Sequence, residues 1–342
     1  MPLWYKTAFS IDHHTLMNKT DTPAASTEPD ESIDAEQELQ ARVAWHYYVG
    51  NLTQQEIAQR IGSNRVRVNR LLAASRESGL VQITINSRIA PCVALEEALV
   101  ERFGLAGAVV VPSGITPEAN VAALGIGAAT YFSKQIEAGF TIGLGWGRTI
   151  RAVLRALPQR AYGPISAVSL QGGLSHCPSI NTFDIVSDFA NLCHADGYLF
   201  AAPIYVSSQK ARDVILQEGT VRETYELAKS ADLALLTVGD LTESLVITYG
   251  IDNPDDLRML RKAGAVGDML GHFIDEDGKL INHPLNRRTV AIALDDLRQI
   301  KRVVLVSGGA KKFPVTRAAL RGQYVSVLVT DEDCARRLVS EP

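Results

Sequence analysis

Hydrophobic positions recur along this chain with two different periods. Between residues 34 and 80 the apolar residues are spaced three and four apart, which predicts three helices with one buried face each. From residue 91 onward, short continuous apolar runs alternate with helical stretches. Such runs are typical of buried parallel strands joined by helices. The pattern therefore predicts a small helical domain followed by a large α/β domain.

Residues 52–80 carry the most specific spacing in the chain. Thr53 is a good N-cap residue, and Glu56 three residues later completes a capping box. Gly62 ends this short helix, since glycine adopts a positive φ without strain. Asn64 caps a second helix of the pair. The stretch thus predicts two short helices joined by a tight turn.

These two helices match the spacing of a helix-turn-helix. Ala58 lets the helices approach closely, and Val68 and Leu71 fill the angle between them. Residues 41–80 hold six Arg, no Lys and two Glu, a net charge of +4, whereas the whole chain has a formal net charge of -4. This reversal favours a nucleic-acid contact over a helical subdomain with a solvated basic face. The predicted DNA-binding residues are Thr53, Gln54, Asn64, Arg65, Arg67, Asn69 and Arg70.

The segments on either side of the helix pair have predicted structures of their own. Residues 1–33 are polar, acidic and proline-bearing, which predicts a flexible leader. The alternation VQITIN over residues 81–86 predicts a strand that serves as a wing, and residues 86–91 predict a domain junction. The predicted division is a leader over 1–33, a DNA-binding domain over 34–88 and a large domain over 89–342.

The large domain is predicted to contain a mainly parallel sheet covered by helices on both faces. In such folds ligands bind at the carboxyl ends of the strands. The predicted strands span residues 108–112, 140–144, 165–170, 198–202, 233–238, 303–307 and 325–329, and the predicted helices include 117–137, 181–194, 315–321 and 332–339.

Two glycine-rich strand ends carry the chemical signal. Residues 143–149 follow a strand and open a helix, where backbone N–H groups can bind an anion that glycine lets approach. Residues 307–312 repeat this arrangement and add two lysines. The first segment is not a dinucleotide or Walker motif in register, and alone it could be a tight turn. The second alone could be a surface lysine pair beside a turn. Together they favour binding of a phosphorylated small molecule.

Carboxylates near strand ends add a second signal. Asp240, Asp268 and Asp275 could hold sugar hydroxyls or could form turns, and the last two lie in a predicted glycine-rich loop. The segment DEDG does not satisfy a calcium loop in register. No metal and no cofactor are predicted, because the histidines lack ligand spacing. These are His176, His194, His272 and His283, of which only His272 is near the suspected pocket.

The composition limits the classes of protein to which the chain can belong. The chain is 46% hydrophobic and 21% charged, and it has no apolar run of the roughly 18 residues that a membrane span needs. Residues 1–20 show no secretory signal pattern. Cysteines without C-x-x-C spacing predict reduced, mostly buried thiols in a cytoplasmic protein. They are Cys92, Cys177, Cys193 and Cys334.

After residue 36 the chain resembles the SorC-type sugar-binding transcriptional regulators over nearly its whole length. The resemblance rests on LTQQEIAQRIG with RVNRLL, on GLGWGRT, on GAVGDMLGHFIDEDG, and on VVLVSGGAKK with ALRGQYVSVLVTDE, in the family's order. ARVAWHYYVGNLTQQEIA, INTFDIVSDFANLC and APIYVSS look most like the polyol-operon branch, which includes erythritol-type repressors.

This resemblance implies a winged helix-turn-helix followed by a Rossmann-like α/β effector domain similar to glucosamine-6-phosphate deaminase and ribose-5-phosphate isomerase. It also implies a homo-oligomer, usually a tetramer, that binds double-stranded operator DNA and responds to a phosphorylated sugar or polyol. By motif, Gly145–Thr149 resembles a phosphate cradle, and Asp268 a hydroxyl-binding residue. The effector-binding residues that follow are Gly145, Trp146, Gly147, Arg148, Thr149, Asp268, Gly308, Gly309 and Lys312.

Two positions depart from the family pattern. Asn64 stands where serine is more usual, and Phe313-Pro314 follow Lys312 where a polar helical run is commoner, which leaves the direction of Lys312 open. The sequence therefore predicts a ligand-controlled DNA-binding regulator and not an enzyme. The alternative is a sugar-phosphate isomerase or deaminase with a DNA-binding appendage, in which Asp268, His272 and Lys312 would supply acid and base.

Overall fold

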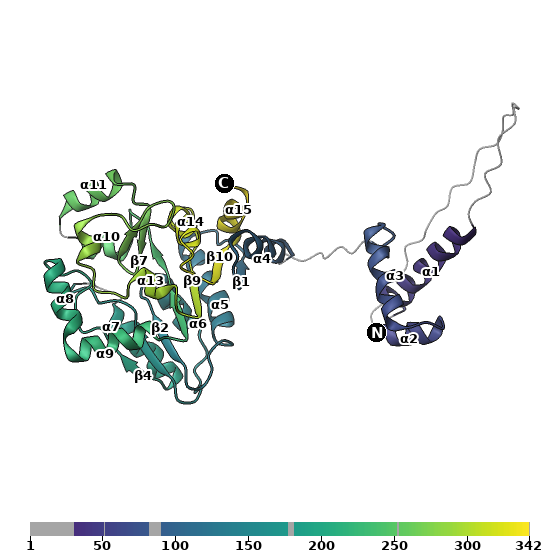
Figure 1. Ribbon diagram of the computed structural model, residues 1–342, viewed down its shortest axis with the longest axis horizontal. Helices are drawn as coiled ribbons and strands as arrows, with labels where there is room; N and C mark the ends of the chain where they lie inside the picture. Colours follow the sequence, from purple (N-terminus) through teal and green to yellow (C-terminus); the bar gives the residue numbers. More distant parts are fainter. Residues whose placement is uncertain (1–30, 51, 82–89, 177–180, 252, 342) are drawn as a thin grey trace, which may run out of the picture. The chain divides into compact units, whose positions relative to one another are not determined.

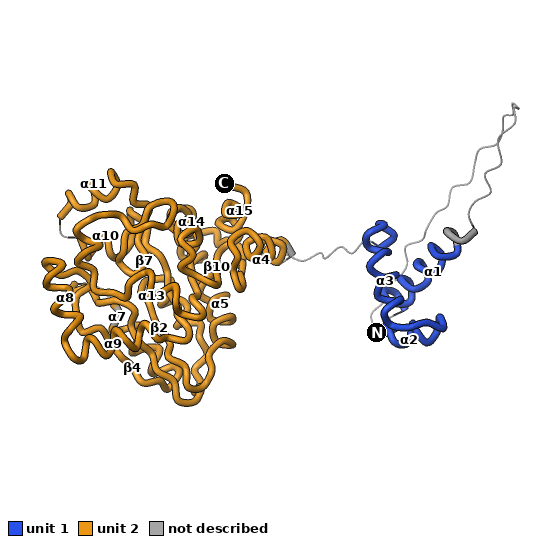
Figure 2. Tube along the Cα trace, in the orientation of Figure 1, with its two compact units in different colours: residues 1–85 blue, residues 86–342 orange. Residues whose placement is uncertain are grey.

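The computed structural model describes residues 31–50, 52–81, 90–176, 181–251 and 253–341. Figure 2 shows that the chain forms two compact units, residues 1–85 and residues 86–342. Within the described ranges, no helix is both long and apolar enough to cross a lipid bilayer. Three described cysteines, Cys92, Cys193 and Cys334, are buried free thiols.

The first unit packs three helices around a small apolar core. The predicted capping box is present, because the Thr53 hydroxyl accepts from the Glu56 amide at 3.3 Å and the Glu56 carboxylate accepts from the Thr53 amide at 2.7 Å. Gly62 has a φ of 63°, and the Asn64 side chain accepts from the Arg67 amide at 2.9 Å. The helices are α1 (Glu31–Tyr48), α2 (Gln54–Arg60) and α3 (Arg65–Glu77), and their core is Val43, Ile57, Ala58, Val68, Leu71 and Leu72.

The edges of this unit differ from the predicted ones or lie beyond what is described. Helix α1 begins at Glu31, so the helical part starts before residue 34. The rest of the predicted leader, residues 1–30, lies outside the described residues. So do residues 82–86 of the predicted wing and residues 86–89 of the predicted junction. The last two residues of that junction, Ala90 and Pro91, are already part of α4.

The second unit is built on a seven-stranded sheet with every neighbouring pair parallel, in the order β1-β10-β9-β5-β2-β3-β4. Figure 1 shows β9, β10 and β1 of this sheet side by side. The predicted parallel α/β architecture is thereby confirmed. The strands are β1 (Gly107–Val111), β2 (Thr141–Leu144), β3 (Ser166–Ser169), β4 (Asp196–Tyr198), β5 (Leu233–Leu236), β9 (Arg302–Val306) and β10 (Val327–Asp331).

Apolar cores lie on both faces of the sheet, because successive side chains of a strand point to opposite sides. The edge strand β4 is exposed and joins neither core. Val303 and Leu305 join one apolar cluster, and Val304 and Val306 join the other. The first cluster also contains residues from α4 (Ala90–Phe103), α9 (Gly219–Lys229), α14 (Phe313–Arg321) and α15 (Glu332–Ser340). The second contains residues from α5 (Pro117–Phe132), α6 (Arg148–Ala156) and α7 (Thr182–Cys193). Shorter helices complete the unit, namely α8 (Gln209–Gln217), α10 (Leu245–Tyr249), α11 (Pro254–Lys262), α12 (Pro284–Arg287) and α13 (Leu294–Leu297).

The prediction of a strand over 198–202 was wrong in its position. Strand β4 ends at Tyr198, and within the described ranges it pairs with β3 alone. Beyond Tyr198 the Phe200 amide donates to the Ser169 hydroxyl at 2.7 Å. A side chain thus takes the N–H group that would otherwise continue the ladder.

The glycine-rich segment 264–278 is a hairpin and not the predicted loop. Strands β7 (Gly267–Met269) and β8 (His272–Ile274) pair antiparallel, and β6 (Val238–Gly239) pairs with β7. Leu270 and Gly271 both have positive φ, at 53° and 78°, which is the turn that matches the twist of a two-residue hairpin. Asp268 therefore sits in the middle strand of a small sheet, where its backbone is held on both sides.

Candidate functional site

A cavity of about 1260 Å³ opens at the carboxyl ends of the parallel strands. Residues that follow β1, β2, β5, β9 and β10 line it, so groups from distant parts of the chain converge there. This is the edge at which parallel α/β folds bind ligands. Every predicted effector-binding residue lines the cavity except Gly145.

Lys312 points into this cavity, which settles the direction that the sequence left open. Its ammonium donates to the Thr149 hydroxyl at 3.3 Å and to the Thr237 hydroxyl at 3.1 Å. The next residue, Phe313, buries its ring in the core, which fixes the course of the backbone beside Lys312. Burial lowers the pKa of Lys312 to about 8, although the negative charges of Asp240 and Asp268 act in the opposite direction. The lysine is thus a cation held in place at the base of the cavity.

The start of α6 supplies hydrogen-bond donors beside this lysine. Gly147 is the N-cap, with a φ of 140° and no side chain to cap the helix. The first N–H groups of a helix lack partners within the helix and carry a partial positive charge. The Gly145 amide does not add to them, because it donates to the Leu235 carbonyl at 2.9 Å. Gly145 instead allows close packing, since a Cβ there would lie 3.1 Å from the Leu236 Cβ.

Two buried polar atoms in the cavity wall have no protein partner among the described residues. They are Oδ1 of Asp268 and Nε1 of Trp146. The other oxygen of Asp268 accepts from the Gly271 amide at 3.1 Å. Burial raises the pKa of Asp268 to about 6, partly offset by this hydrogen bond and by Lys312. An acceptor and a donor without partners in one cavity fit a ligand that carries hydroxyl groups.

The loop after β6 forms one rim of the cavity. Asp240 accepts from the amides of Thr242 and Glu243 at 2.7 and 2.8 Å. Burial raises the pKa of Asp240, but these hydrogen bonds and that from the Thr242 hydroxyl outweigh burial and leave the pKa below its usual value. Arg148 donates to the Glu243 carbonyl at 2.7 Å, and Lys311 forms an ion pair with the Glu243 carboxylate. Lys311 therefore lies at the exposed rim, unlike Lys312.

Asp331 holds the second glycine-rich segment, residues 307–312, by hydrogen bonding. Its carboxylate accepts from the Gly309 amide at 2.6 Å, from the Asn120 side chain at 3.1 Å and from the Ser113 hydroxyl at 3.2 Å. A Cβ at Gly308 would lie 2.0 Å from this carboxylate. The Gly309 amide is therefore already bonded within the protein. The position of Asp331 requires glycine at 308, whereas Gly309 is favoured by its φ of 82°.

Replacing Gly308 with alanine should destabilise the protein by about 2 kcal/mol, because the added methyl would overlap a carboxylate that several hydrogen bonds hold in place. Gly219→Ala is the matched control, since a Cβ there meets nothing within 4 Å. Urea unfolding of the two full-length variants measures the difference. Equal stabilities would show that Asp331 moves aside readily.

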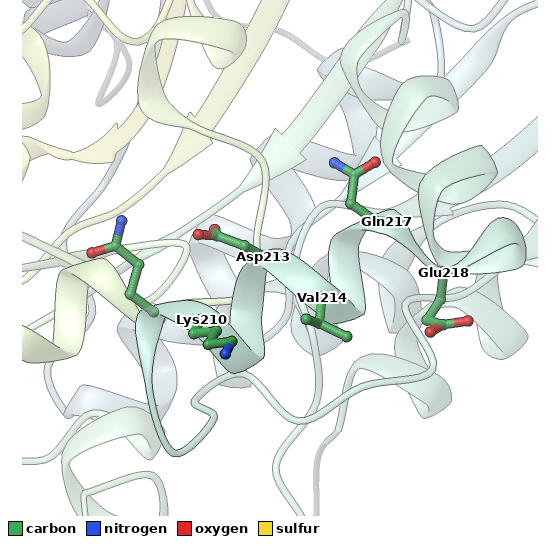
Figure 3. A pocket seen from close by; sticks show the side chains of 6 residues that line it. Lys210, Asp213, Val214, Gln217 and Glu218 are labelled. Atoms are coloured by element: carbon green, nitrogen blue, oxygen red, sulfur yellow. The ribbon is translucent and has the colours of Figure 1, made fainter.

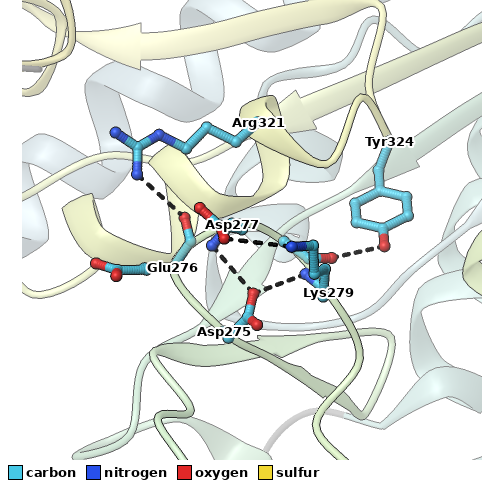
Figure 4. Close-up of polar contacts among 7 residues, drawn as sticks. Asp275, Glu276, Asp277, Lys279, Arg321 and Tyr324 are labelled. Atoms are coloured by element: carbon cyan, nitrogen blue, oxygen red, sulfur yellow. Dashed lines mark hydrogen bonds and ion pairs between the residues drawn. The ribbon is translucent and has the colours of Figure 1, made fainter.

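The other candidate groups have structural roles. Asp275 accepts from the amides of Asp277 and Lys279 at 3.0 and 2.8 Å, so it forms a turn (Figure 4). The Tyr324 hydroxyl fixes the same turn by donating to the Gly278 carbonyl at 2.6 Å. Asp275 is therefore the turn former that the sequence allowed as an alternative.

His272 does not line the cavity. Its Nε2 lies 3.2 Å from the Ile292 carbonyl, and burial lowers its pKa to about 4, so the ring is neutral at physiological pH. A second hollow lies over α8, where side chains such as Lys210, Asp213 and Gln217 project from one helix (Figure 3). No groups from different strands converge there. Among the described residues, no group of three His, Cys, Asp or Glu could hold a metal ion.

The predicted DNA-binding residues lie along α2 and α3 of the first unit. The side chains of Thr53 and Asn64 cap these helices. Arg65 donates to the Gln54 side chain at 3.0 Å, and Arg67 lies 3.6 Å from the Glu36 carboxylate. Asn69 and Arg70 are exposed one turn further along α3.

Comparisons with known proteins show the family of the chain. Residues 87–340 match the Sugar-bind family of sugar-binding domains. The transcriptional regulator LsrR of Klebsiella pneumoniae subsp. pneumoniae is 34% identical over 312 residues, which cover 90% of this chain and 94% of that protein. The erythritol catabolism regulatory protein EryD of Brucella abortus is 30% identical over 312 residues, covering 90% and 98%. The crystal structure of the full-length sorbitol operon regulator SorC from Klebsiella pneumoniae matches with a TM-score of 0.69 and 27% identity, over 90% of this chain and 100% of that one.

The chain belongs to the SorC-type family of sugar-binding transcriptional regulators. Its relatives are named regulators and not enzymes, which favours the regulator over the isomerase or deaminase alternative.

Sequence reasoning missed several residues of this SorC-type regulator. Thr237 was not predicted because it falls inside a longer predicted strand, which the structure divides into β5 and β6. Asn120 lies in none of the quoted motifs, and Asp331 lies in ALRGQYVSVLVTDE, from which no site residue was predicted. Val66 is not among the predicted DNA-binding residues, although its side chain is exposed on α3 outside the apolar stripe.

Proposed function

We propose that this regulator binds duplex operator DNA through α3 and that a phosphorylated sugar or polyol in the cavity controls that binding. The observation that carries the effector proposal is the position of Lys312, between the hydroxyls of Thr149 and Thr237 and beside the start of α6. A cation, hydroxyl donors and a helix N-terminus together suit a phosphate group.

The remainder of the cavity supports a polyhydroxy compound attached to that phosphate. Asp268 offers an acceptor and Trp146 a donor, and both atoms are buried without a protein partner among the described residues. The names of two relatives, which refer to erythritol catabolism and to the sorbitol operon, agree with a sugar or polyol effector.

The DNA-binding part of the proposal rests on the net charge and exposed side chains of the helix pair. Helix α3 presents Arg65, Asn69 and Arg70 to solvent, residue types that suit phosphates and base edges. We further infer a cytoplasmic homo-oligomer, a tetramer by family resemblance, whose symmetry sets the spacing of operator half-sites. The effector changes DNA affinity only if it binds the two conformations of the regulator unequally.

Thermal unfolding of the full-length protein tests the effector proposal. The protein is heated with a panel of sugars and polyols, each supplied free and phosphorylated. We expect one phosphorylated compound to raise the unfolding temperature, since a ligand that binds only the native state stabilises it. Stabilisation by a free polyol alone would contradict the phosphate assignment, and no stabilisation by any compound would overturn the effector proposal.

The affinity for that effector should fall as the pH rises above about 8, where Lys312 loses its proton. Below this pH the lysine is charged and contributes fully, and above it affinity should fall by up to tenfold per pH unit. Titration calorimetry between pH 7 and pH 9.5 measures the effect. Lys312→Arg is the control, because a guanidinium stays charged throughout. The same decline in both proteins would exclude Lys312 as its source.

A further inference from the structure

Val66 is an apolar side chain in a place where none is needed for folding. It is 78% exposed, whereas Val68, Leu71 and Leu72 on the same helix are at most 4% exposed. A β-branched residue is a mediocre helix former, so it does not stabilise α3 by its helix propensity either. A function of α3 therefore explains a valine at position 66 better than folding does.

The surroundings of Val66 are the predicted DNA-contacting residues. Arg65 and Arg67 flank it in sequence, and Asn69 and Arg70 share its face of the helix at the i+3 and i+4 positions. Arg65 is held by Gln54 and Arg67 by Glu36, so these two side chains are positioned on either side of the valine. The result is one methyl-bearing side chain within a basic, amide-bearing surface.

We propose that Val66 makes α3 specific for a thymine, by packing its methyl groups against the thymine 5-methyl group in the major groove. This inference rests on the proposed DNA binding. The basic surface is complementary in charge to a polyanion. Among the four bases only thymine presents a methyl group in the major groove, so an apolar side chain there discriminates for it. Val66 also carries a single χ angle and is rigid in a helix, so little conformational entropy is lost on contact.

The test begins with duplexes that the full-length protein selects from a random pool. In the best duplex, each thymine is replaced in turn by deoxyuridine, which removes only the 5-methyl group. At one position in each half-site we expect binding to weaken about fourfold, as for the loss of one buried methyl group. With Val66→Ala, binding to the unmodified duplex should weaken similarly, and the same deoxyuridine should then have no further effect.

Two controls isolate the contact. Val93→Ala removes an exposed valine, 46% exposed, from the second unit and should leave the deoxyuridine effect as in the wild type. The unfolding temperature shows whether the Val66→Ala protein is folded. We expect it to be folded, because the Val66 side chain is exposed. A selected duplex that is indifferent to every deoxyuridine, or a deoxyuridine effect that persists in Val66→Ala, would overturn this inference alone. Failure to select any duplex would overturn the proposed DNA binding and this inference with it.

Discussion

Replacing Lys312 with methionine should weaken binding of the phosphorylated effector by roughly two orders of magnitude. The lysine supplies the buried cation of the cavity, and hydrogen bonds to charged groups contribute about 1.5–3 kcal/mol each. Methionine keeps a side chain of similar length, so the cavity wall remains filled. Binding to DNA without effector should be unchanged. Calorimetry measures the first quantity and a duplex-binding titration measures the second.

Lys311→Met is the matched control for this experiment. Lys311 is the adjacent residue, but its side chain is 60% exposed and pairs with Glu243 at the rim. Surface ion pairs contribute at most about 1 kcal/mol, so effector affinity should change little. An equal loss in both variants would mean that the cavity attracts anions by its overall charge and that Lys312 holds no phosphate. Loss of DNA binding in Lys312→Met would indicate a structural role instead.

Replacing Arg70 with alanine should weaken binding to the selected duplex by about 1–3 kcal/mol and relax its sequence preference. Arg70 is exposed on α3, away from the core formed by Val68 and Leu71, so the fold should persist. The effector should still raise the unfolding temperature, because its site lies wholly in the second unit. Duplex-binding titrations and thermal unfolding on the same preparation measure both effects.

Arg258→Ala provides the corresponding control. Its side chain is 77% exposed on α11 and pairs only at the surface with Asp255, so it removes the same charge from the second unit. DNA affinity should stay at the wild-type value. If both variants weakened DNA binding equally, net charge would account for the loss and α3 would not be the reading helix.

Signals that are local in sequence predicted their structures well. The reciprocal hydrogen bonds of Thr53 and Glu56, the positive φ of Gly62 and the cap at Asn64 each depend on residues at most three positions apart. The buried strands were also predictable, because continuous apolar runs need both faces of a sheet to be covered. Their ends were displaced by one or two residues. The strand predicted over 198–202 was misplaced, because β4 ends at Tyr198 and the distant Ser169 accepts from the Phe200 amide.

Features set by distant residues could not be derived in this way. The hairpin that carries Asp268 consists of three-residue strands with glycine at the turn, too short to show an alternating pattern. The contact between Lys312 and Thr149 joins residues 163 positions apart. The Gly309 amide looked available for an anion because nothing in its neighbourhood revealed Asp331 as its partner. Sequence therefore located the edge of the sheet that carries the candidate site, and the tertiary structure shows which contacts each residue makes there.

Two buried atoms of the cavity wall, Oδ1 of Asp268 and Nε1 of Trp146, have no protein partner among the described residues. They bear on how long the protein persists in the cell. Each costs stability until something hydrogen-bonds to it. A sugar that satisfies both lowers the fraction of molecules that is unfolded, and proteases act mainly on that fraction. The same compound that controls the regulator would then lengthen its lifetime, so that the cell holds more of the protein while the sugar is present.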